Sequence, residues 1–317
     1  MRAAFVQELG GIDRVELGEQ PDLKPAAGQG LIRVYSAAVG PWDVGFVRGA
    51  FPGITAPYVL GQEVAGVVEA VGGETDVQPG DRVFATLFPA GGGFAEYAVA
   101  GADDLAPMPE RASFEEAAAL VIGGGTAYEG LVDRGHLKAG ETVLVTAAAG
   151  GVGHTAVQIA AAVGARPLGV ASASNHEYLR SLGVDEVFDY HVGDWVKQVL
   201  AAVPGGVDLL LDAAGGQTRD QAVGAVRDEG RVISLLGYGS ADGQMTFGPL
   251  QLERGITGES FGAHITRQRL EALSRMVDAG QLRAEVEAVL PLEQAREALE
   301  RVARGHTRGK VVVQVRK

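Results

Sequence analysis

The chain has 317 residues, of which 46% are hydrophobic and 21% are charged, and its formal net charge is −13. This composition is that of a folded globular protein and excludes a disordered chain. The acidic balance repels phosphate backbones and anionic lipid, so we expect neither a nucleic-acid partner nor binding to a membrane surface.

Cysteine is absent from the sequence, which excludes disulfides, thiolate catalysis and cysteine-ligated metals. The six His residues show no metal-ligand spacing, so we expect no metal site. Residues 1–11 lack the apolar run of a signal peptide, and no segment is apolar enough to span a membrane. We therefore expect a cytoplasmic protein.

The first 120 residues have a β-rich pattern. Short runs rich in β-branched residues, separated by Gly and Pro, predict strands at 31–35, 63–71 and 82–84. From about residue 120, apolar strands alternate with amphipathic helices, which indicates an α/β fold with a doubly wound parallel sheet covered on both faces. The predicted strands are 142–146, 166–171, 186–190, 208–213, 231–236 and 256–260, and the predicted helices are 153–163 and 175–182.

The C-terminal part predicts two more helices, at about 266–279 and 291–303, and a final β-branched strand at 310–315. That strand has no partner nearby in the sequence, so we expect it to return to the N-terminal β-rich region. This gives two domains, one formed by residues 1–122 and 264–317 and a second by residues 123–263.

A Gly-rich segment at 143–153 follows a buried strand and opens an amphipathic helix. As a dinucleotide-binding fingerprint, it has Ala148, Gly150 and Gly153 at the three glycine positions. Gly150 would let the backbone approach a pyrophosphate, and Gly153 would let the helix pack closely on the strand. A packing turn without a ligand is the alternative. The cofactor-binding residues expected in this loop are Ala149, Gly150, Gly151 and Val152.

The second predicted strand distinguishes NAD from NADP. An NAD site places an acid about 20 residues after the Gly-rich loop, where it binds the ribose hydroxyls. Here the strand ends in Ser172, Ser174 and Asn175, without an acid. Small hydroxyl and amide groups suit a 2′-phosphate, so we predict NADP(H), with Tyr190 adding to the pocket. A simple helix N-cap is the alternative for these residues.

The chain resembles the zinc-free, quinone oxidoreductase-like branch of the medium-chain dehydrogenase/reductase superfamily over nearly its whole length. The resemblance implies a GroES-like β-domain formed by both chain ends, a Rossmann domain between them, a cleft where they meet, and a homodimer joined through the strand at 256–260. The matching segments are 37–43, 60–66, 77–84, 92–97, 125–131, the Gly-rich loop, 182–190 and 307–313.

Two departures from the superfamily pattern bear on the reaction. Zinc-dependent relatives have a Cys near Val39 and Gly40 and a His where Gln62 stands, so zinc-dependent alcohol dehydrogenation is not expected. Some enoyl-thioester reductases carry a proton-donating Tyr at the position of Phe51, which disfavours that chemistry here. The position of an Asn that is common in zinc-free relatives falls at or beside Gly40, and this chain has no Asn there.

The resemblance therefore implies hydride transfer from NADPH to a small hydrophobic conjugated carbonyl substrate, such as a quinone, enone or enal. Asp43 and Tyr58 are the candidate catalytic residues, although Asp43 could equally cap a helix. The expected substrate contacts are Trp42, Phe46, Phe51, Phe88 and Phe94.

Four further residues are candidate cofactor contacts. Thr126 is expected to open the first inter-domain helix, and Lys310 is expected to reach the cofactor phosphates unless it is a solvated surface charge. Gly237 and Phe261 follow the ends of late strands, where the nicotinamide usually passes. Two alternatives remain open: a crystallin-like protein that binds NADPH without turnover, and an enoyl-thioester reductase.

Overall fold

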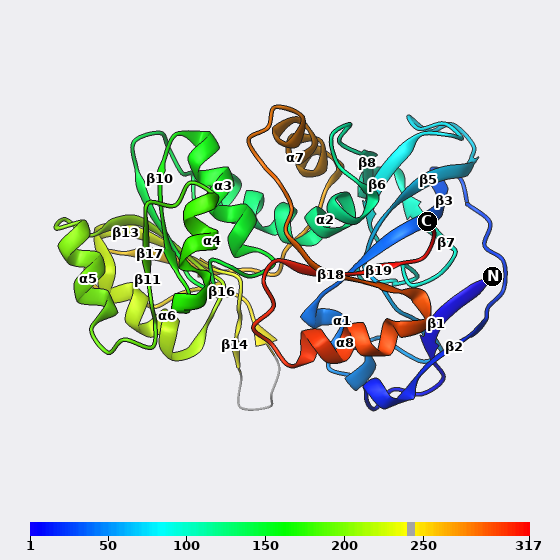
Figure 1. Ribbon diagram of the computed structural model, residues 1–317, viewed down its shortest axis with the longest axis horizontal. Helices are drawn as coiled ribbons and strands as arrows, with labels where there is room; N and C mark the ends of the chain where they lie inside the picture. Colours follow the sequence, from blue (N-terminus) through cyan, green and yellow to red (C-terminus); the bar gives the residue numbers. More distant parts are fainter. Residues whose placement is uncertain (240–244) are drawn as a thin grey trace. The chain divides into compact units, whose positions relative to one another are not determined.

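The computed structural model describes residues 1–239 and 245–317 (Figure 1). Within them the chain divides into two compact units, which we call unit 1 (1–122 and 265–317) and unit 2 (123–264). The second boundary lies one residue after the predicted one.

Unit 1 is built from two sheets. The larger has the strand order β18–β19–β3–β5–β6–β8, with β7 pairing with β3, and the smaller has the order β2–β1–β4. The strands are β1 (Arg2–Val6), β2 (Val15–Glu19), β3 (Gln29–Val39), β4 (Tyr58–Val59), β5 (Glu63–Gly72), β6 (Arg82–Thr86), β7 (Tyr97–Gly101), β8 (Leu105–Pro107), β18 (Val286–Pro291) and β19 (Lys310–Gln314). The helices are α1 (Pro41–Arg48), α7 (Arg267–Asp278) and α8 (Ala295–Ala303), and α2 (Phe114–Tyr128) crosses the unit boundary.

The core of unit 1 joins both parts of the chain. Alternate residues of β3, including Ile32 and Val34, are fully buried, as expected for a strand with one face on a core. Strand β19 pairs antiparallel with β3, Val311 opposite Val39, and its Val311 and Val313 belong to the same core. The prediction that the last strand returns to the N-terminal region is confirmed.

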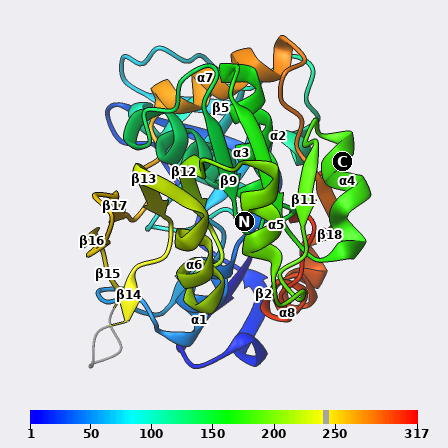
Figure 2. The same cartoon turned by 90° about the vertical axis from the view of Figure 1, so that its left-hand side faces the viewer.

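Unit 2 contains a seven-stranded sheet with the order β11–β10–β9–β12–β13–β17–β16. Six strands are parallel, and β16 pairs antiparallel with β17 at the edge. Figures 1 and 2 show helices on both faces of this sheet, which confirms the predicted doubly wound architecture. The elements are β9 (Thr142–Val145), α3 (Gly153–Val163), β10 (Arg166–Val170), α4 (His176–Ser181), β11 (Glu186–Phe188), α5 (Trp195–Ala202), β12 (Val207–Asp212), α6 (Gly216–Ala222), β13 (Val226–Ser234), β14 (Tyr238–Gly239), β15 (Met245–Thr246), β16 (Gly248–Pro249) and β17 (Thr257–Ser260).

One strand of unit 2 differs clearly from its prediction. Strand β13 begins at Val226, five residues before the predicted start, because its polar first half, residues 227–230, has the composition of a turn. Glu229 takes a φ of +56°, and the pairing with β12 shifts register between Val207 and Leu209. An irregularity of this kind lets turn-like residues continue a strand.

Helix α1 begins with a buried acidic cap. Pro41 is the first helical residue, and Asp43 Oδ2 accepts the Gly40 N–H at 2.8 Å. Asp43 is fully buried, and burial raises the pKa of its carboxyl from 3.8 to about 7, with the Gly40 amide opposing that rise. The helix-cap alternative for Asp43 is therefore the one that the structure bears out.

A second buried carboxylate joins distant parts of unit 1. Lys310 Nζ lies 2.5 Å from Glu63 Oε1 and 4.6 Å from the centre of the Trp42 ring. Glu63 Oε2 accepts the Ile122 N–H at 2.8 Å. Lys310 is only 3% exposed and its charge is compensated by Glu63, so we correct the expectation that it reaches the cofactor phosphates and assign it to this buried ion pair.

Replacing Lys310 by Met should lower the free energy of unfolding by about 3–5 kcal/mol, because the Glu63 carboxylate then stays buried without its cation. Denaturant titration of the purified variant measures this loss. The double variant Glu63→Gln, Lys310→Met should recover part of it, since a neutral amide can still accept the Ile122 N–H. A single variant as stable as the wild type would contradict the assignment.

Replacing Asp43 by Asn should change how stability depends on pH. The unfolded chain releases the Asp43 proton near pH 3.8 and the folded chain near pH 7, so this group stabilises the fold at low pH and the stabilisation disappears as the pH rises through that window. Relative to the wild type, Asp43→Asn should therefore gain up to about 4 kcal/mol between pH 4 and pH 8.

Urea unfolding at a series of pH values measures this difference. The exposed Asp103, replaced by Asn, is the matched control for removal of one negative charge and should leave the wild-type profile unchanged. Parallel profiles for Asp43→Asn and the wild type would show that Asp43 does not titrate in this way.

Candidate functional site: a dinucleotide-binding edge

The Gly-rich loop connects β9 to α3 and leaves no room for a side chain at its last glycine. A Cβ on Gly153 would lie 2.2 Å from the Ala147 carbonyl oxygen and 2.6 Å from Ala148 Cα. Ala147 itself takes a φ of +47°, a conformation that residues with a Cβ seldom adopt. The third fingerprint glycine thus allows the start of α3 to pack directly on the loop backbone.

The start of α3 suits an anionic group. No side chain caps this 11-residue helix, whose N-cap is Val152, and an uncapped helix start favours negative charge. Gly123 of α2 packs against the loop from another direction, because a Cβ there would lie 2.4 Å from the Gly151 carbonyl oxygen. The predicted contacts Ala149, Gly150, Gly151 and Val152 lie together in this loop, which fits the diphosphate of a dinucleotide.

The small polar residues after β10 form a group of their own. Ser172 Oγ lies 3.2 Å from Ser174 Oγ and accepts a hydrogen bond from Asn175 Nδ2, also at 3.2 Å. Neither the short 3-10 turn Ala173–Asn175 nor α4 has a side-chain N-cap, so the helix-cap alternative is not what these side chains do. Tyr190 follows β11, half-buried, with its ring 4.1 Å from that of His191.

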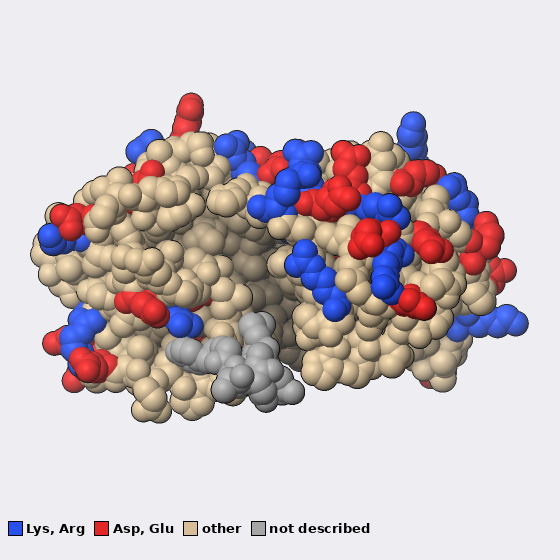
Figure 3. All heavy atoms as spheres, turned by 90° about the horizontal axis from the view of Figure 1, so that it is seen from below, with Lys and Arg blue, Asp and Glu red and all other residues tan. Residues whose placement is uncertain are grey.

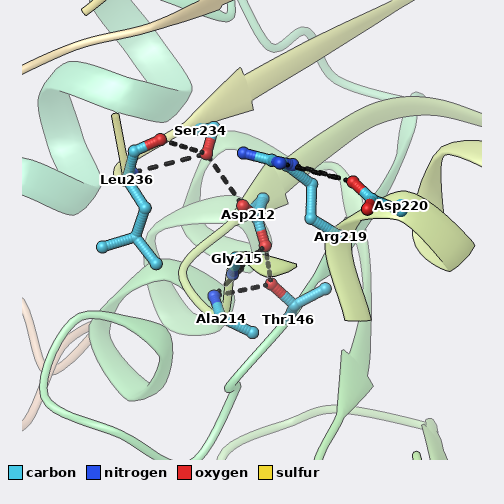
Figure 4. Close-up of polar contacts among 8 residues, drawn as sticks. All are labelled: Thr146, Asp212, Ala214, Gly215, Arg219, Asp220, Ser234 and Leu236. Carbon is cyan, nitrogen blue, oxygen red and sulfur yellow. Dashed lines mark hydrogen bonds and ion pairs between the residues drawn. The ribbon is translucent and has the colours of Figure 1, made fainter. Parts of the chain in front are cut away.

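A buried Asp lies at the carboxyl edge of three adjacent strands (Figure 4). Asp212 Oδ1 accepts hydrogen bonds from the Thr146 hydroxyl at 2.8 Å and the Gly215 N–H at 3.0 Å. Asp212 Oδ2 accepts the Ser234 hydroxyl at 2.8 Å, and Thr146 Oγ1 accepts the Ala213 N–H at 2.9 Å. The ends of β9, β12 and β13 are thereby held together.

This network marks the place where the strand order reverses. The chain runs outward from β9 through β10 to β11 and then returns to β12 on the other side of β9, and ligands of doubly wound sheets bind beside such a reversal. The sequence interpretation missed Thr146, Asp212 and Ser234. An acid directly after the apolar run Leu209–Leu211 was the available signal for Asp212.

The remaining cofactor candidates lie in unit 2. Thr126 is 5% exposed and lies in the last turn of α2, so the expectation that it opens a helix is wrong. Phe261 is 4% exposed, its N–H donates to the Ser234 carbonyl at 3.1 Å, and the Arg134 guanidinium lies 4.5 Å from its ring centre. Gly237 is half-buried just after β13.

Most of the predicted aromatic substrate contacts gather in unit 1. Phe46 stacks on Phe51 with ring centres 4.3 Å apart, and its ring centre lies 5.5 Å from that of Tyr58 and 5.6 Å from that of Phe88. Phe46 is 1% exposed, whereas Phe88 is 44% exposed and Phe51 is half-buried. Phe51 and Phe88 can therefore contact a ligand, with Phe46 supporting them from behind.

Two other aromatic candidates have different surroundings. Phe94 is 0% exposed in the unit 1 core, and its ring occupies the space that a side chain on Gly61 would need. We therefore correct the assignment of Phe94 from substrate contact to core residue. Trp42 is half-buried against Lys310, and its Nε1 is buried without a hydrogen-bond partner among the described residues.

Tyr58 and Gln62 form the polar part of this region. Gln62 Nε2 donates to the Tyr58 hydroxyl at 2.7 Å, and that hydroxyl donates to the Pro89 carbonyl at 2.9 Å. Burial raises the pKa of Tyr58, which keeps its hydroxyl protonated. Gln62, which replaces the His of zinc-dependent relatives, is thus bonded to a tyrosine, and its Oε1 accepts no hydrogen bond from any described residue.

Other classes of site are not visible in the described part of the chain. It contains no group of three or more His, Cys, Asp or Glu side chains arranged to hold a metal ion. None of its helices combines the length and apolarity needed to cross a membrane. On the face drawn in Figure 3, Lys and Arg side chains lie interspersed with Asp and Glu.

Comparison with known proteins places this geometry in a family. Residues 26–110 match the family model described as an alcohol dehydrogenase GroES-like domain, and residues 182–313 match the one described as a zinc-binding dehydrogenase. The quinone oxidoreductase of Pongo abelii is 32% identical over 96% of this chain and 94% of its own length. The synaptic vesicle membrane protein VAT-1 homolog of Rattus norvegicus is 32% identical over 99% of this chain and 84% of its own length.

A solved structure gives the same result. The quinone oxidoreductase from Coxiella burnetii superposes with a TM-score of 0.87 at 29% identity, covering 100% of this chain and 99% of that one. The predicted combination of a GroES-like domain with a Rossmann-type parallel sheet is thereby confirmed. The chain is an oxidoreductase-type member of the medium-chain dehydrogenase/reductase superfamily and belongs to its quinone oxidoreductase-like branch.

Proposed function

We propose that this protein is an NADPH-dependent reductase that transfers a hydride to a small conjugated carbonyl compound, such as a quinone, enone or enal, without zinc. The observation that carries the proposal is the close contact at Gly153, which packs the start of α3 directly on the Gly-rich loop. No side chain caps this helix start, so a diphosphate can bind there. When bound, the cofactor supplies the hydride.

The residues proposed to hold the cofactor belong to unit 2. Loop residues 149–152 surround the diphosphate. Gly150 lets the backbone approach it, while its own N–H donates to the Ala147 carbonyl at 2.9 Å. The cluster of Ser172, Ser174 and Asn175 receives the 2′-phosphate, with Tyr190 beside it. Toward the nicotinamide we assign Thr126, Gly237 and Phe261. The absence of an acid at the tip of β10 supports NADPH over NADH.

The proposed substrate surface is apolar. Phe51 and Phe88 keep exposed area for a flat conjugated ligand, and Trp42 is the third aromatic candidate. Tyr58 and Asp43, the predicted catalytic residues, suit positioning better than proton transfer. The Tyr58 hydroxyl already donates to Pro89, and Asp43 is fully buried at the start of α1. We therefore assign the proton that completes the reduction to water.

The substrate class can be tested by following NADPH absorbance with quinones, enones and enoyl thioesters, alongside NADH controls. Turnover of quinones or enones supports the proposal. Cofactor binding without turnover of any compound would instead indicate a binding protein, and activity confined to the thioesters would indicate an enoyl-thioester reductase. Assembly as a homodimer through the strand at 256–260 belongs to the same proposal, with β16 pairing along the outer side of two residues of that strand, Glu259 and Ser260.

Replacing Gly153 by Ala should weaken NADPH binding about tenfold or more, because the new Cβ would displace the backbone at Ala147 and Ala148. Fluorescence titration with NADPH measures the dissociation constant. Gly193→Ala is the matched control, since a Cβ there meets nothing within 4 Å, and it should bind as the wild type does. Equal affinities for Gly153→Ala and the wild type would remove the main support for the cofactor site.

A further inference from the structure

An acidic side chain, Asp189, lies beside the turn proposed to receive the 2′-phosphate. It comes from the end of β11, whereas β10, the strand that leads into the turn, ends without an acid. Strands β10 and β11 are parallel neighbours, with Val170 opposite Phe188. Asp189 is the next residue after β11, and its Oδ2 accepts the Ala173 N–H at 3.1 Å. That amide belongs to the same 3-10 turn, Ala173–Asn175, as Ser174 and Asn175.

This carboxylate is held in its charged form. Asp189 Oδ1 accepts the backbone N–H of His191 at 2.9 Å and lies 2.8 Å from His191 Nδ1. The His191 amide lowers the pKa of Asp189, with the imidazole and the Ala173 N–H adding to the effect. The Asp189 side chain is 18% exposed while that of His191 is 62% exposed, so the imidazole partner is well solvated.

We propose that Asp189 is a specificity-determining residue for the adenosine end of the cofactor. Its carboxylate repels the 2′-phosphate and so limits the preference for NADPH over NADH. The inference rests on the proposed NADPH site. Ribose hydroxyls can donate hydrogen bonds to a carboxylate, whereas a 2′-phosphate is repelled by it. The described side chains that bond one another within the turn, Ser172, Ser174 and Asn175, are neutral and do not offset that repulsion.

The test removes the charge and measures binding of two fragments that differ only in the 2′-phosphate, 2′,5′-ADP and 5′-AMP. Calorimetric titration of Asp189→Asn should show a dissociation constant for 2′,5′-ADP that is about three- to tenfold lower than that of the wild type. The value for 5′-AMP should change less than twofold. The gain for 2′,5′-ADP should shrink as salt is added, because the interaction is between charges near solvent.

Asp185 provides the matched control. It is exposed, it precedes β11 at the other end of the strand, and four residues of extended chain put it about 13 Å from Asp189. Asp185→Asn changes the net charge equally and should leave both dissociation constants at their wild-type values. Asp189→Ser, whose hydroxyl can also accept the Ala173 N–H, should repeat the result of Asp189→Asn.

Two results would overturn the inference. Unchanged or weaker binding of 2′,5′-ADP by both Asp189 variants, with 5′-AMP affected by the same factor, would mean that Asp189 only orders the turn. An equal gain in Asp185→Asn would mean that net charge alone is responsible. Failure of the proposed function looks different, because the wild-type protein would then bind neither fragment and neither reduced nucleotide.

Discussion

The contact between the start of α3 and the backbone at Ala147 and Ala148 is the constraint on which the proposed cofactor site depends. Gly153 leaves this contact free of side-chain atoms, and Gly123 does the same where α2 meets the loop at Gly151. The backbones of both helices, α2 and α3, therefore contact the loop backbone directly, with no side chain between them at these two glycines. The loop conformation, including the positive φ of Ala147, is stabilised by this packing and by the hydrogen bond that the Gly150 N–H donates to the Ala147 carbonyl.

The charge of the chain makes this local geometry important. With a net charge of −13, the protein repels a dinucleotide at long range, so the proposed site has to hold it by local interactions that act against this field. Backbone amides at the start of a helix provide such interactions without adding a cation. The Asp212 network keeps the neighbouring strand ends in place. The Asp212 carboxylate accepts its hydrogen bonds from hydroxyl and amide groups of the protein.

Much of this architecture could be predicted from the sequence because hydrophobic periodicity and Gly placement report directly on strands, helices and tight turns. The doubly wound sheet, the Gly-rich loop and the return of the last strand follow from such local signals. Side-chain partners across the fold do not. Lys310 pairs with Glu63, 247 residues away, and Asp189 reaches Ala173 from the next strand. Three consecutive glycines, residues 123–125, directly precede Thr126 within α2, so nothing local indicated that Thr126 lies inside a helix.

The buried pair of Glu63 and Lys310 also sets an order for folding during synthesis on the ribosome. Residues 123–264 form unit 2 as one continuous stretch, so it can fold as soon as they have emerged. The sheet of unit 1 lacks β18 and β19 until later, and Glu63 lacks its cation until Lys310 has been translated. The first part of unit 1 is therefore made before unit 2, but its sheet is completed after unit 2, and the open sheet edge at β3 stays exposed to other chains in the meantime.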